Sequence, residues 1–447
     1  MLLSVVPDSI KDFTYSYPDQ GATMADIDKR NSTLRAEKKN ILSEPNIGDL
    51  KTHKWYTDEV FAQQQFTGTN PVTIQIASTT WVQGFTKAAS SQSLTEYVAL
   101  LDSASKTSSL FVQDCGYYRS TLGVSSDVEF KADNTPKDKP RYACSSVTLF
   151  HLTDSGMLHP IAVVIDYKGS IENSVTIFNT RKSPDEQTDQ ANDWPWRYAK
   201  SAAQSSDWLQ HELTVHLTNC HLVEEATIVC DPCNLLVNRI FQYHANENQV
   251  ASKRALATNH LVYRCLQPHW LKTLSLNAAA RATLVPSVII PIVGFSGSQT
   301  YDFVQKAYQN FDWQANYVPA DLERRGFPVK DLLDQGDVKF HNYAYGKQAL
   351  LMWRVLRKFV ASFLANGGQG FDTDAKVAAD ADIKRWCDEM RSDAGGQMES
   401  WPAIKTVDQL VDCVTMCIRT CNPGSRAAEN HPPSTHGLVF KQPANTS

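Results

Sequence analysis

Hydrophobic positions change their spacing several times along the chain, and each change predicts a different element. Between Val147 and Tyr167, two apolar and β-branched runs flank the polar stretch Thr153–Gly156. Two such runs around a short turn signal predict a β-hairpin. The following segment, 179–193, is rich in Asp, Asn, Gln and Thr and predicts a loop.

The longest predicted element comes directly after this loop. Between Pro195 and Pro232 there is no glycine or proline, and alanine, leucine and glutamine are frequent. Because an α-helix rises about 1.5 Å per residue, this run predicts a single helix of roughly 50 Å. A helix of that length is typical of the central strut of a large helical core.

Two further helices are indicated towards the C-terminus. In the first, apolar residues recur every three or four positions: Ala349, Leu350, Trp353, Leu356, Val360 and Phe363 or Leu364. Gly367 and Gly368 are expected to end this helix. Thr406 and Gln409 match a capping box at the start of the second. No 20- to 50-residue period repeats, which excludes a solenoid. Taken together, these elements predict a mainly α fold with a long central helix and a small β element.

This pattern places one domain between residues 51 and 421. Residues 1–50 are polar and mixed, and predict an extended or loosely helical lead-in segment. Residues 422–447 contain four prolines and few apolar positions, and predict an irregular tail.

Composition and charge exclude several classes of protein. The 447 residues include 43 Lys and Arg and 48 Asp and Glu, which gives a net charge of −5. The chain therefore lacks the excess of basic residues that is typical of a nucleic-acid-binding protein. The apolar run Leu284–Phe295 is interrupted by prolines and too short for a transmembrane helix. The N-terminus lacks a basic signal-peptide region, and ten cysteines without regular spacing indicate reduced thiols. We therefore expect a cytoplasmic protein.

Candidate chemistry is concentrated on the predicted long helix. His211, His216 and His221 are each five residues apart, among apolar neighbours. Imidazole is a ligand for iron, manganese, zinc or copper. In a regular α-helix the fifth neighbour is rotated by about 140°, so these rings converge only if the helix is locally underwound into a π-bulge. Histidines that serve only as core or surface residues would give the same spacing, which is not that of the zincin metalloproteases.

A second metal-binding pattern is weaker. Cys230 and Cys233 form one CxxC pair, and with Cys220 and a histidine they would supply zinc ligands by residue type. No second CxxC accompanies the pair.

The flanking segments resemble the lipoxygenase family. Eight segments match in the family's order: Trp55–Pro71, Leu110–Asp114, Trp196–Lys200 with Asp207 and the three histidines, His260–His269, Leu276–Arg281, Pro319–Gly326, His341–Ala344 and Trp401–Val411. The resemblance covers the compact catalytic domain of short, fungal-type members, without the N-terminal β-barrel of longer ones. It implies the helical lipoxygenase fold.

The resemblance also implies a chemistry. In this family a non-haem iron, or manganese in some fungal members, removes a hydrogen atom from the bis-allylic methylene of a polyunsaturated fatty acid. Dioxygen then adds to the pentadienyl radical and gives a hydroperoxide. Transferred to this sequence, His211 and His216 become the expected metal ligands and His221 a neighbour of the site.

Three further positions follow from the same resemblance. Ala280 occupies the family position that is linked to stereochemistry, where alanine implies S-type oxygenation. Leu276 and Leu284 become candidate walls of the substrate channel. The same three residues are equally consistent with ordinary packing in a helical core.

The sequence departs from the family in three places. Where a His-x-x-x-Asn ligand motif is expected, it has Ser425 and Arg426, and it ends at Ser447 without the isoleucine whose carboxylate binds the metal in the family. Residues 230–258 are also longer than the family's connection. These departures suggest a truncated or imperfectly spliced product, and they leave open a lipoxygenase-like chain without catalytic activity.

Overall fold

The structure of the chain is a computed structural model. It describes residues 56–420 apart from 134, 136–139, 229–254, 271–276, 335, 366–369 and 394. The predicted lead-in at 1–50 and the predicted tail at 422–447 lie outside the described residues.

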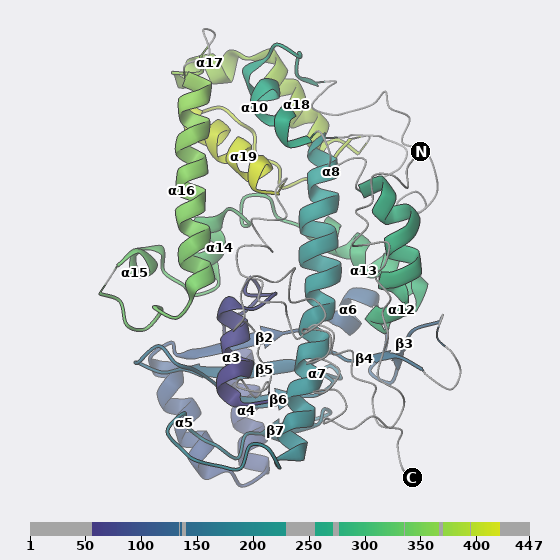
Figure 1. Ribbon diagram of the computed structural model, residues 1–447, viewed down its shortest axis with the longest axis vertical. Helices are drawn as coiled ribbons and strands as arrows, with labels where there is room; N and C mark the ends of the chain where they lie inside the picture. Colours follow the sequence, from purple (N-terminus) through teal and green to yellow (C-terminus); the bar gives the residue numbers. More distant parts are fainter. Residues whose placement is uncertain are drawn as a thin grey trace, which may run out of the picture.

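A five-stranded antiparallel sheet forms the base of the molecule in Figure 1, with the strand order β1-β2-β5-β6-β7. Its strands are β1 (Gln75–Ile76), β2 (Leu110–Asp114), β5 (Val147–Leu152), β6 (Leu158–Val164) and β7 (Thr176–Phe178). Strands β5 and β6 are the predicted hairpin, with Leu152 paired to Leu158 and Gly156 in the turn at φ +77°. The hairpin prediction is therefore confirmed.

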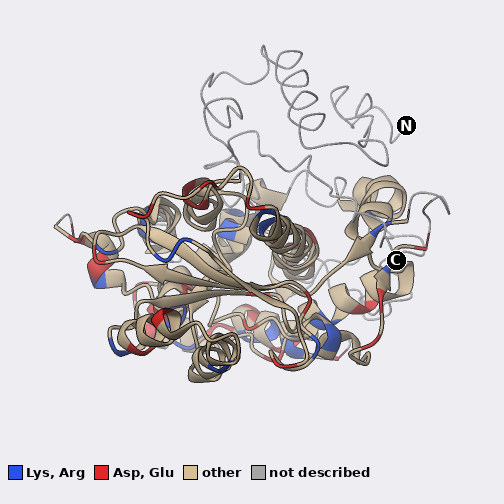
Figure 2. Cartoon of the chain, turned by 90° about the horizontal axis from the view of Figure 1, so that it is seen from below, with Lys and Arg blue, Asp and Glu red and all other residues tan. Residues whose placement is uncertain are grey.

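Helices cover both faces of this sheet, as Figure 2 shows. One face packs on α3 (Asp58–Thr67) and α7 (Trp194–Gln210), and the other on α4 (Thr79–Ser91) and α5 (Thr95–Lys106). Alternate strand residues join two hydrophobic clusters: Phe111, Phe150 and Val163 in the first, Leu110, Val112, Leu149 and Ala162 in the second. Burial on both faces explains why the strand sequences are almost continuously apolar.

The predicted long helix is a continuous rod made of three segments. Helix α7 passes without a break into η2 (His211–Leu222), a π-helix, and then into α8 (Val223–Ile228). Asp193 caps the start, because its carboxylate accepts the N–H of Trp196. The rod runs from the sheet to the opposite end of the molecule (Figure 1), so the prediction holds up to Ile228.

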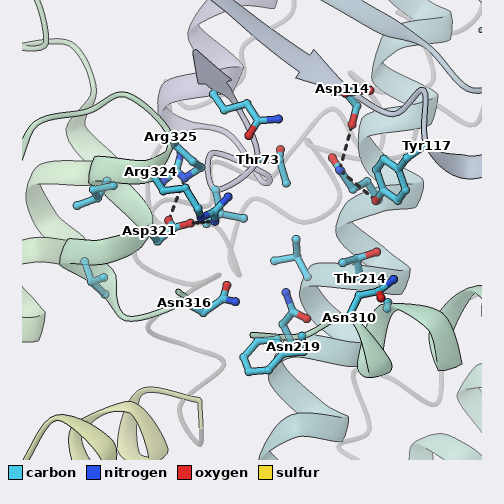
Figure 3. A pocket seen from close by; sticks show the side chains of 18 of the residues that line it. Thr73, Asp114, Tyr117, Thr214, Asn219, Asn310, Asn316, Asp321, Arg324 and Arg325 are labelled. Atoms are coloured by element: carbon cyan, nitrogen blue, oxygen red, sulfur yellow. Dashed lines mark hydrogen bonds and ion pairs between the residues drawn. The ribbon is translucent and has the colours of Figure 1, made fainter. Parts of the chain in front are cut away.

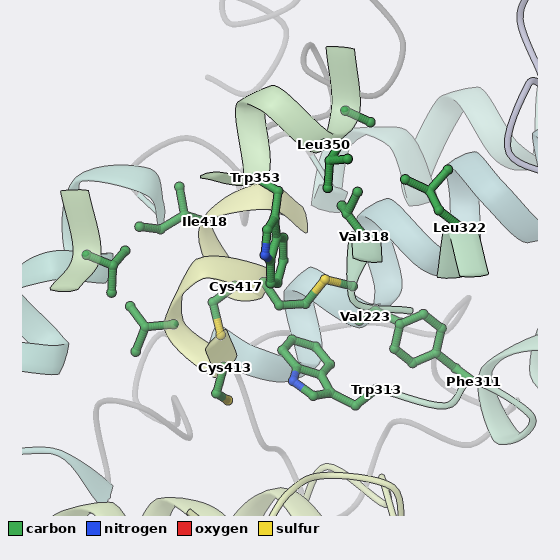
Figure 4. Close-up of a cluster of buried hydrophobic side chains, with 14 of the residues drawn as sticks. Val223, Phe311, Trp313, Val318, Leu322, Leu350, Trp353, Cys413, Cys417 and Ile418 are labelled. Carbon is green, nitrogen blue, oxygen red and sulfur yellow. The ribbon is translucent and has the colours of Figure 1, made fainter. Parts of the chain in front are cut away.

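A helical layer surrounds the far end of the rod. Helix α16 (Ala344–Ala365) packs against α19 (Val407–Thr420) and α10 (Leu261–Trp270), and Figure 4 shows Trp353 and Ile418 in their shared core. The capping box at α19 is present: Gln409 N–H donates to Thr406 Oγ1, and Thr406 N–H donates to Gln409 Oε1. Both C-terminal helices are thus confirmed, although Gly367 and Gly368 lie among the residues that are not described.

The remaining elements complete a mainly α architecture, as predicted. The helices are α6 (Tyr118–Leu122), η3 (Ala280–Ile289), α12 (Ile290–Val293), α13 (Gly297–Gln309), α14 (Val318–Arg324), α15 (Val329–Leu333), α17 (Asp374–Ala379) and α18 (Ala381–Arg391). Strands β3 (Phe130–Lys131) and β4 (Tyr142–Ala143) form a separate pair.

Within the described ranges, no single helix combines the length and apolar character needed to cross a membrane. One bent pair, Asn277–Val293 with Gly297–Gln309 at 104°, satisfies the length and composition criteria when the two are taken together. Basic and acidic residues are interspersed along the ribbon in Figure 2.

Candidate metal centre

The three histidines lie on the underwound part of the rod. All of them fall within η2, where the helix has the i→i+5 character that the five-residue spacing requires. The buried Thr218 hydroxyl adds a side-chain bond of the same reach, since its Oγ1 donates to the carbonyl of Leu213 at 2.6 Å. The condition that convergence of the rings requires, a locally underwound helix, is therefore met.

The structure brings His216 and His221 together more closely than any other pair of the three. Their Nε2 atoms are 3.1 Å apart and their ring planes are inclined by 64°. The ring of His211 instead stacks on His216, with centroids 5.9 Å apart and planes inclined by 11°. The geometry therefore points to the pair His216 and His221, not to His211 and His216 as the resemblance implied.

The outer nitrogen of each ring in this pair has an oxygen partner. Nδ1 of His216 lies 3.3 Å from Glu212 Oε2, and Nδ1 of His221 lies 2.8 Å from Asn277 Oδ1. Because these oxygens are acceptors, each Nδ1 carries a proton, and each ring presents a lone pair at Nε2 when it is neutral. Two ligands at right angles, each about 2.1 Å from one metal ion, are about 3.0 Å apart. Two facing lone pairs at this separation fit a bound cation.

The charges around the pair act in opposite directions on the two rings. Burial and the neighbouring His216 lower the pKa of His221 to about 4, so that its ring is neutral at physiological pH. Burial alone would lower the pKa of His216, but the hydrogen bond and charge of Glu212 outweigh it and raise that pKa. Glu212 stays ionised, since its contacts with His216 more than offset the effect of burial and lower its pKa. A carboxylate behind one imidazole increases its strength as a ligand.

A small cavity of about 40 Å³ adjoins the pair. It is lined by Glu212, His216, Leu217, His221, Leu222, Glu225, Asn277, Ala280, Arg281, Leu284, Val285 and Ile289. Ala280 and Leu284 therefore lie at the site. Leu284 is 36% exposed, so the part of the cavity wall that it forms reaches the surface. Leu276 lies outside the described residues.

Within the described ranges, no group of three His, Cys, Asp or Glu side chains is placed to hold a metal ion. The trio of histidines is therefore a close pair with one stacked neighbour. Ser425, Arg426 and the C-terminal carboxylate belong to the stretch that is not described, and so do Cys230 and Cys233 of the alternative zinc pattern.

Sequence reasoning missed the residues that support the pair. Glu212 could have been found, because it precedes His216 by four positions. Asn277 and Glu225 could not, since the contact of Asn277 with His221 spans 56 residues. Only the folded chain brings them together.

A second, larger cavity of about 410 Å³ lies beside the rod and shares no lining residue with the first. Figure 3 shows Thr214 and Asn219 on one side of it, and Asp321, Arg324 and Arg325 on the other. The buried Arg325 guanidinium donates to Asp321 Oδ2 at 2.9 Å and to the carbonyl of Ile74 at 2.9 Å. No pattern in the sequence predicted this cavity.

Fold and site together define a mainly α protein with a candidate two-histidine metal centre on an underwound helix. The lipoxygenase family model matches residues 16–437. The chain belongs to the lipoxygenase family.

Individual relatives agree with this assignment. A manganese lipoxygenase of Pleurotus sapidus is 48% identical over 387 residues, which are 86% of this chain and 56% of that protein. The chloroplastic lipoxygenase 6 of Arabidopsis thaliana is 25% identical over 84% of this chain and 39% of its own length. A crystal structure of a fungal lipoxygenase from Fusarium graminearum superposes with a TM-score of 0.78 at 37% identity, and covers 92% of this chain and 58% of that one. The chain thus spans between about two fifths and three fifths of the length of these relatives.

Proposed function

We propose that the chain is the metal-binding part of a dioxygenase that inserts O2 into polyunsaturated fatty acids of the linoleate type and forms hydroperoxides. The observation that carries the proposal is the pair of Nε2 atoms 3.1 Å apart on a π-helix, in a chain of the lipoxygenase family. Fatty acid and dioxygen are the proposed partners, and no nucleic acid is involved.

In this proposal His216 and His221 hold a non-haem iron or manganese ion. Manganese is supported by the name of the 48% identical relative, and imidazole nitrogen suits both metals. When bound, the metal supplies the one-electron oxidation and reduction that the reaction requires. His211, the ligand first expected, is assigned a packing role against the ring of His216.

The remaining side chains of the small cavity define the shape of the site and exclude water from it. Leu217, Leu222 and Ile289 give it apolar walls that exclude water from the space beside the histidine pair. Ala280 and Leu284 belong to the same wall, so we assign both to the substrate channel. Leu276 stays a proposed channel residue on the family resemblance alone. An alanine at 280 is proposed to direct oxygenation to S-type products, and Ala280→Gly is expected to raise the share of R-type product.

The proposed location is the cytoplasm. The described cysteines, seven of the ten, are all buried free thiols, as expected for a protein of a reducing compartment.

The test is oxygenation by the purified 447-residue chain after loading with Mn²⁺ or Fe²⁺. Addition of linoleate is expected to cause oxygen uptake and the absorbance of a conjugated diene, and His216→Ala is expected to abolish both. The proposal would be refuted if the chain contained stoichiometric metal but consumed no oxygen with linoleate or other polyunsaturated acids. That result would favour the catalytically inactive alternative.

A further inference from the structure

Two side chains of one helix bind two side chains of the rod, with matched spacing. Asn277, in the helical turn before η3, contacts His221, and Arg281 in η3 forms an ion pair with Glu225 in α8. Asn277 and Arg281 are four residues apart, and so are His221 and Glu225. The two contacts therefore form consecutive rungs between neighbouring helices.

The first rung holds the ring of His221. Asn277 Oδ1 lies 2.8 Å from Nδ1 of His221, and Asn277 Nδ2 donates to the backbone carbonyl of the same residue at 3.2 Å. An amide with Oδ1 towards the ring requires the proton on Nδ1. The ring is thereby fixed in both tautomer and orientation, with Nε2 directed at His216.

The second rung fixes the amide itself. Asn277 Nδ2 also lies 3.2 Å from Glu225 Oε2, and this same oxygen accepts from Arg281 Nη1. Because the amide N–H faces Glu225, Oδ1 must face the histidine. Glu225 and Arg281 expose only 15% and 21% of their side chains, so this contact is shielded from solvent.

Ala280 lies between the two rungs, directly before Arg281, and lines the same cavity as His216 and His221. The contacts that orient His221 therefore also set the distance between the histidine pair and the wall at Ala280. Loss of either contact would displace both His221, the proposed metal ligand, and Ala280 in the cavity wall.

We infer that Asn277 and Arg281 are positioning residues: Asn277 orients His221 for metal binding, and Arg281 acts through Glu225 to hold Asn277 and the Ala280 wall in place. This inference rests on the proposed function. Because the guanidinium of Arg281 is paired with Glu225, we do not assign Arg281 to the binding of a fatty-acid carboxylate.

The test is Mn²⁺ affinity, measured on the purified full chain through the EPR signal of free Mn²⁺, with circular dichroism as the check on folding. Asn277→Leu removes the acceptor at nearly constant size and is expected to weaken Mn²⁺ binding about 10- to 100-fold. Asn277→Asp keeps an acceptor for Nδ1 but loses the N–H that faces Glu225, and is expected to weaken Mn²⁺ binding less than Asn277→Leu does. Asn219→Leu, on the same π-helix but lining the other cavity, is the matched control and is expected to leave the affinity unchanged.

Arg281 is tested by a double-mutant cycle. Arg281→Gln is expected to weaken Mn²⁺ binding several-fold in the wild type but to add nothing in the Asn277→Leu background, because its effect passes through Asn277. Arg281→Lys, which keeps the charge, is expected to restore most of the affinity. Purely additive losses, or no loss, would overturn the assignment of Arg281.

The outcomes separate this inference from the proposed function. A folded wild-type chain that binds no Mn²⁺ or Fe²⁺ would overturn both. A wild type that binds metal, with Asn277→Leu binding equally well, would overturn the inference alone.

Discussion

His216 and His221 face one another with their Nε2 atoms 3.1 Å apart, although an α-helix would turn them to different sides. The π-helical geometry of η2 makes the contact possible, and Glu212 and Asn277 direct both lone pairs into the same space. The contact distinguishes two candidate ligand pairs that the five-residue spacing alone leaves equivalent.

The choice of ligand pair can be tested directly. His216→Ala and His221→Ala are each expected to weaken Mn²⁺ or Fe²⁺ binding by at least about 100-fold, since a lost ligand costs more than a lost supporting contact. His211→Ala is expected to keep most of the affinity. Metal content after dialysis is the measurement, with circular dichroism to confirm folding. Retention of metal by His221→Ala together with its loss in His211→Ala would restore the pair expected from the sequence.

Thr218 is expected to stabilise the underwound segment. Its buried hydroxyl donates to the carbonyl five residues earlier, and Thr218→Val removes this bond while keeping the shape of the side chain. We expect the free energy of unfolding to fall by about 1 kcal/mol, measured by urea denaturation. Thr80→Val, at an exposed position of α4, serves as the control and is expected to change little. Equal effects of the two substitutions would contradict a role for the hydroxyl.

Asp207 gives the stability of the protein a specific pH dependence. Burial raises the pKa of its carboxyl group from 3.8 to about 7, even though Asn70 and Gln65 donate to it. Below about pH 3.8 both folded and unfolded chains hold this proton. As the pH rises from there to about 7, only the unfolded chain releases it, so Asp207 reduces stability by up to about 1.4 kcal/mol per pH unit, and the loss levels off above pH 7.

Asp207→Asn is expected to remove this pH dependence. The new amide still offers an oxygen to Asn70 and Gln113, and its N–H can reach Gln65 Oε1, which has no hydrogen-bond partner, once that amide rotates. The melting temperature of the variant relative to the wild type should therefore rise between pH 5 and pH 8. A constant difference across this range would contradict the raised pKa.

Asp58 is the charge on which the contact between α3 and α7 depends. Its buried carboxylate accepts from Lys200 Nζ at 2.9 Å, Trp196 Nε1 at 2.8 Å and Asn179 Nδ2 at 2.8 Å. Burial alone would raise the pKa of Asp58, but Lys200 and these hydrogen bonds outweigh it and lower the pKa. Its contribution to stability is therefore complete above about pH 3.8 and is lost as the pH falls through the lowered pKa.

Asp58→Asn is expected to destabilise the fold by about 3–5 kcal/mol at neutral pH, because it leaves the fully buried Lys200 without its counter-charge. Urea denaturation measures the change, and Asp154→Asn at an exposed turn is the control. A loss below about 1 kcal/mol would show that Lys200 is stabilised by other contacts.

The sequence predicted those features that depend on local patterns. The hairpin at 147–167, the long rod and the capping box at Thr406 follow from alternation, from the absence of glycine and proline, and from side chains three positions apart. The five-residue spacing of the histidines indicated that their rings could converge only on an underwound helix, and η2 is one. The pairing of the rings was not predictable, because it depends on Asn277, which reaches His221 from a helix 56 residues away. The larger cavity likewise forms between the distant elements η2 and α14.

The unbroken passage from α7 through η2 to α8 limits how the chain length can vary. Each residue of a helix turns the following segment by close to 100°, so one insertion or deletion between Trp194 and Ile228 would rotate α8 away from α19 and separate Glu225 from Arg281. Related chains are therefore expected to differ in length before or after the rod, and to keep the number of residues within it constant.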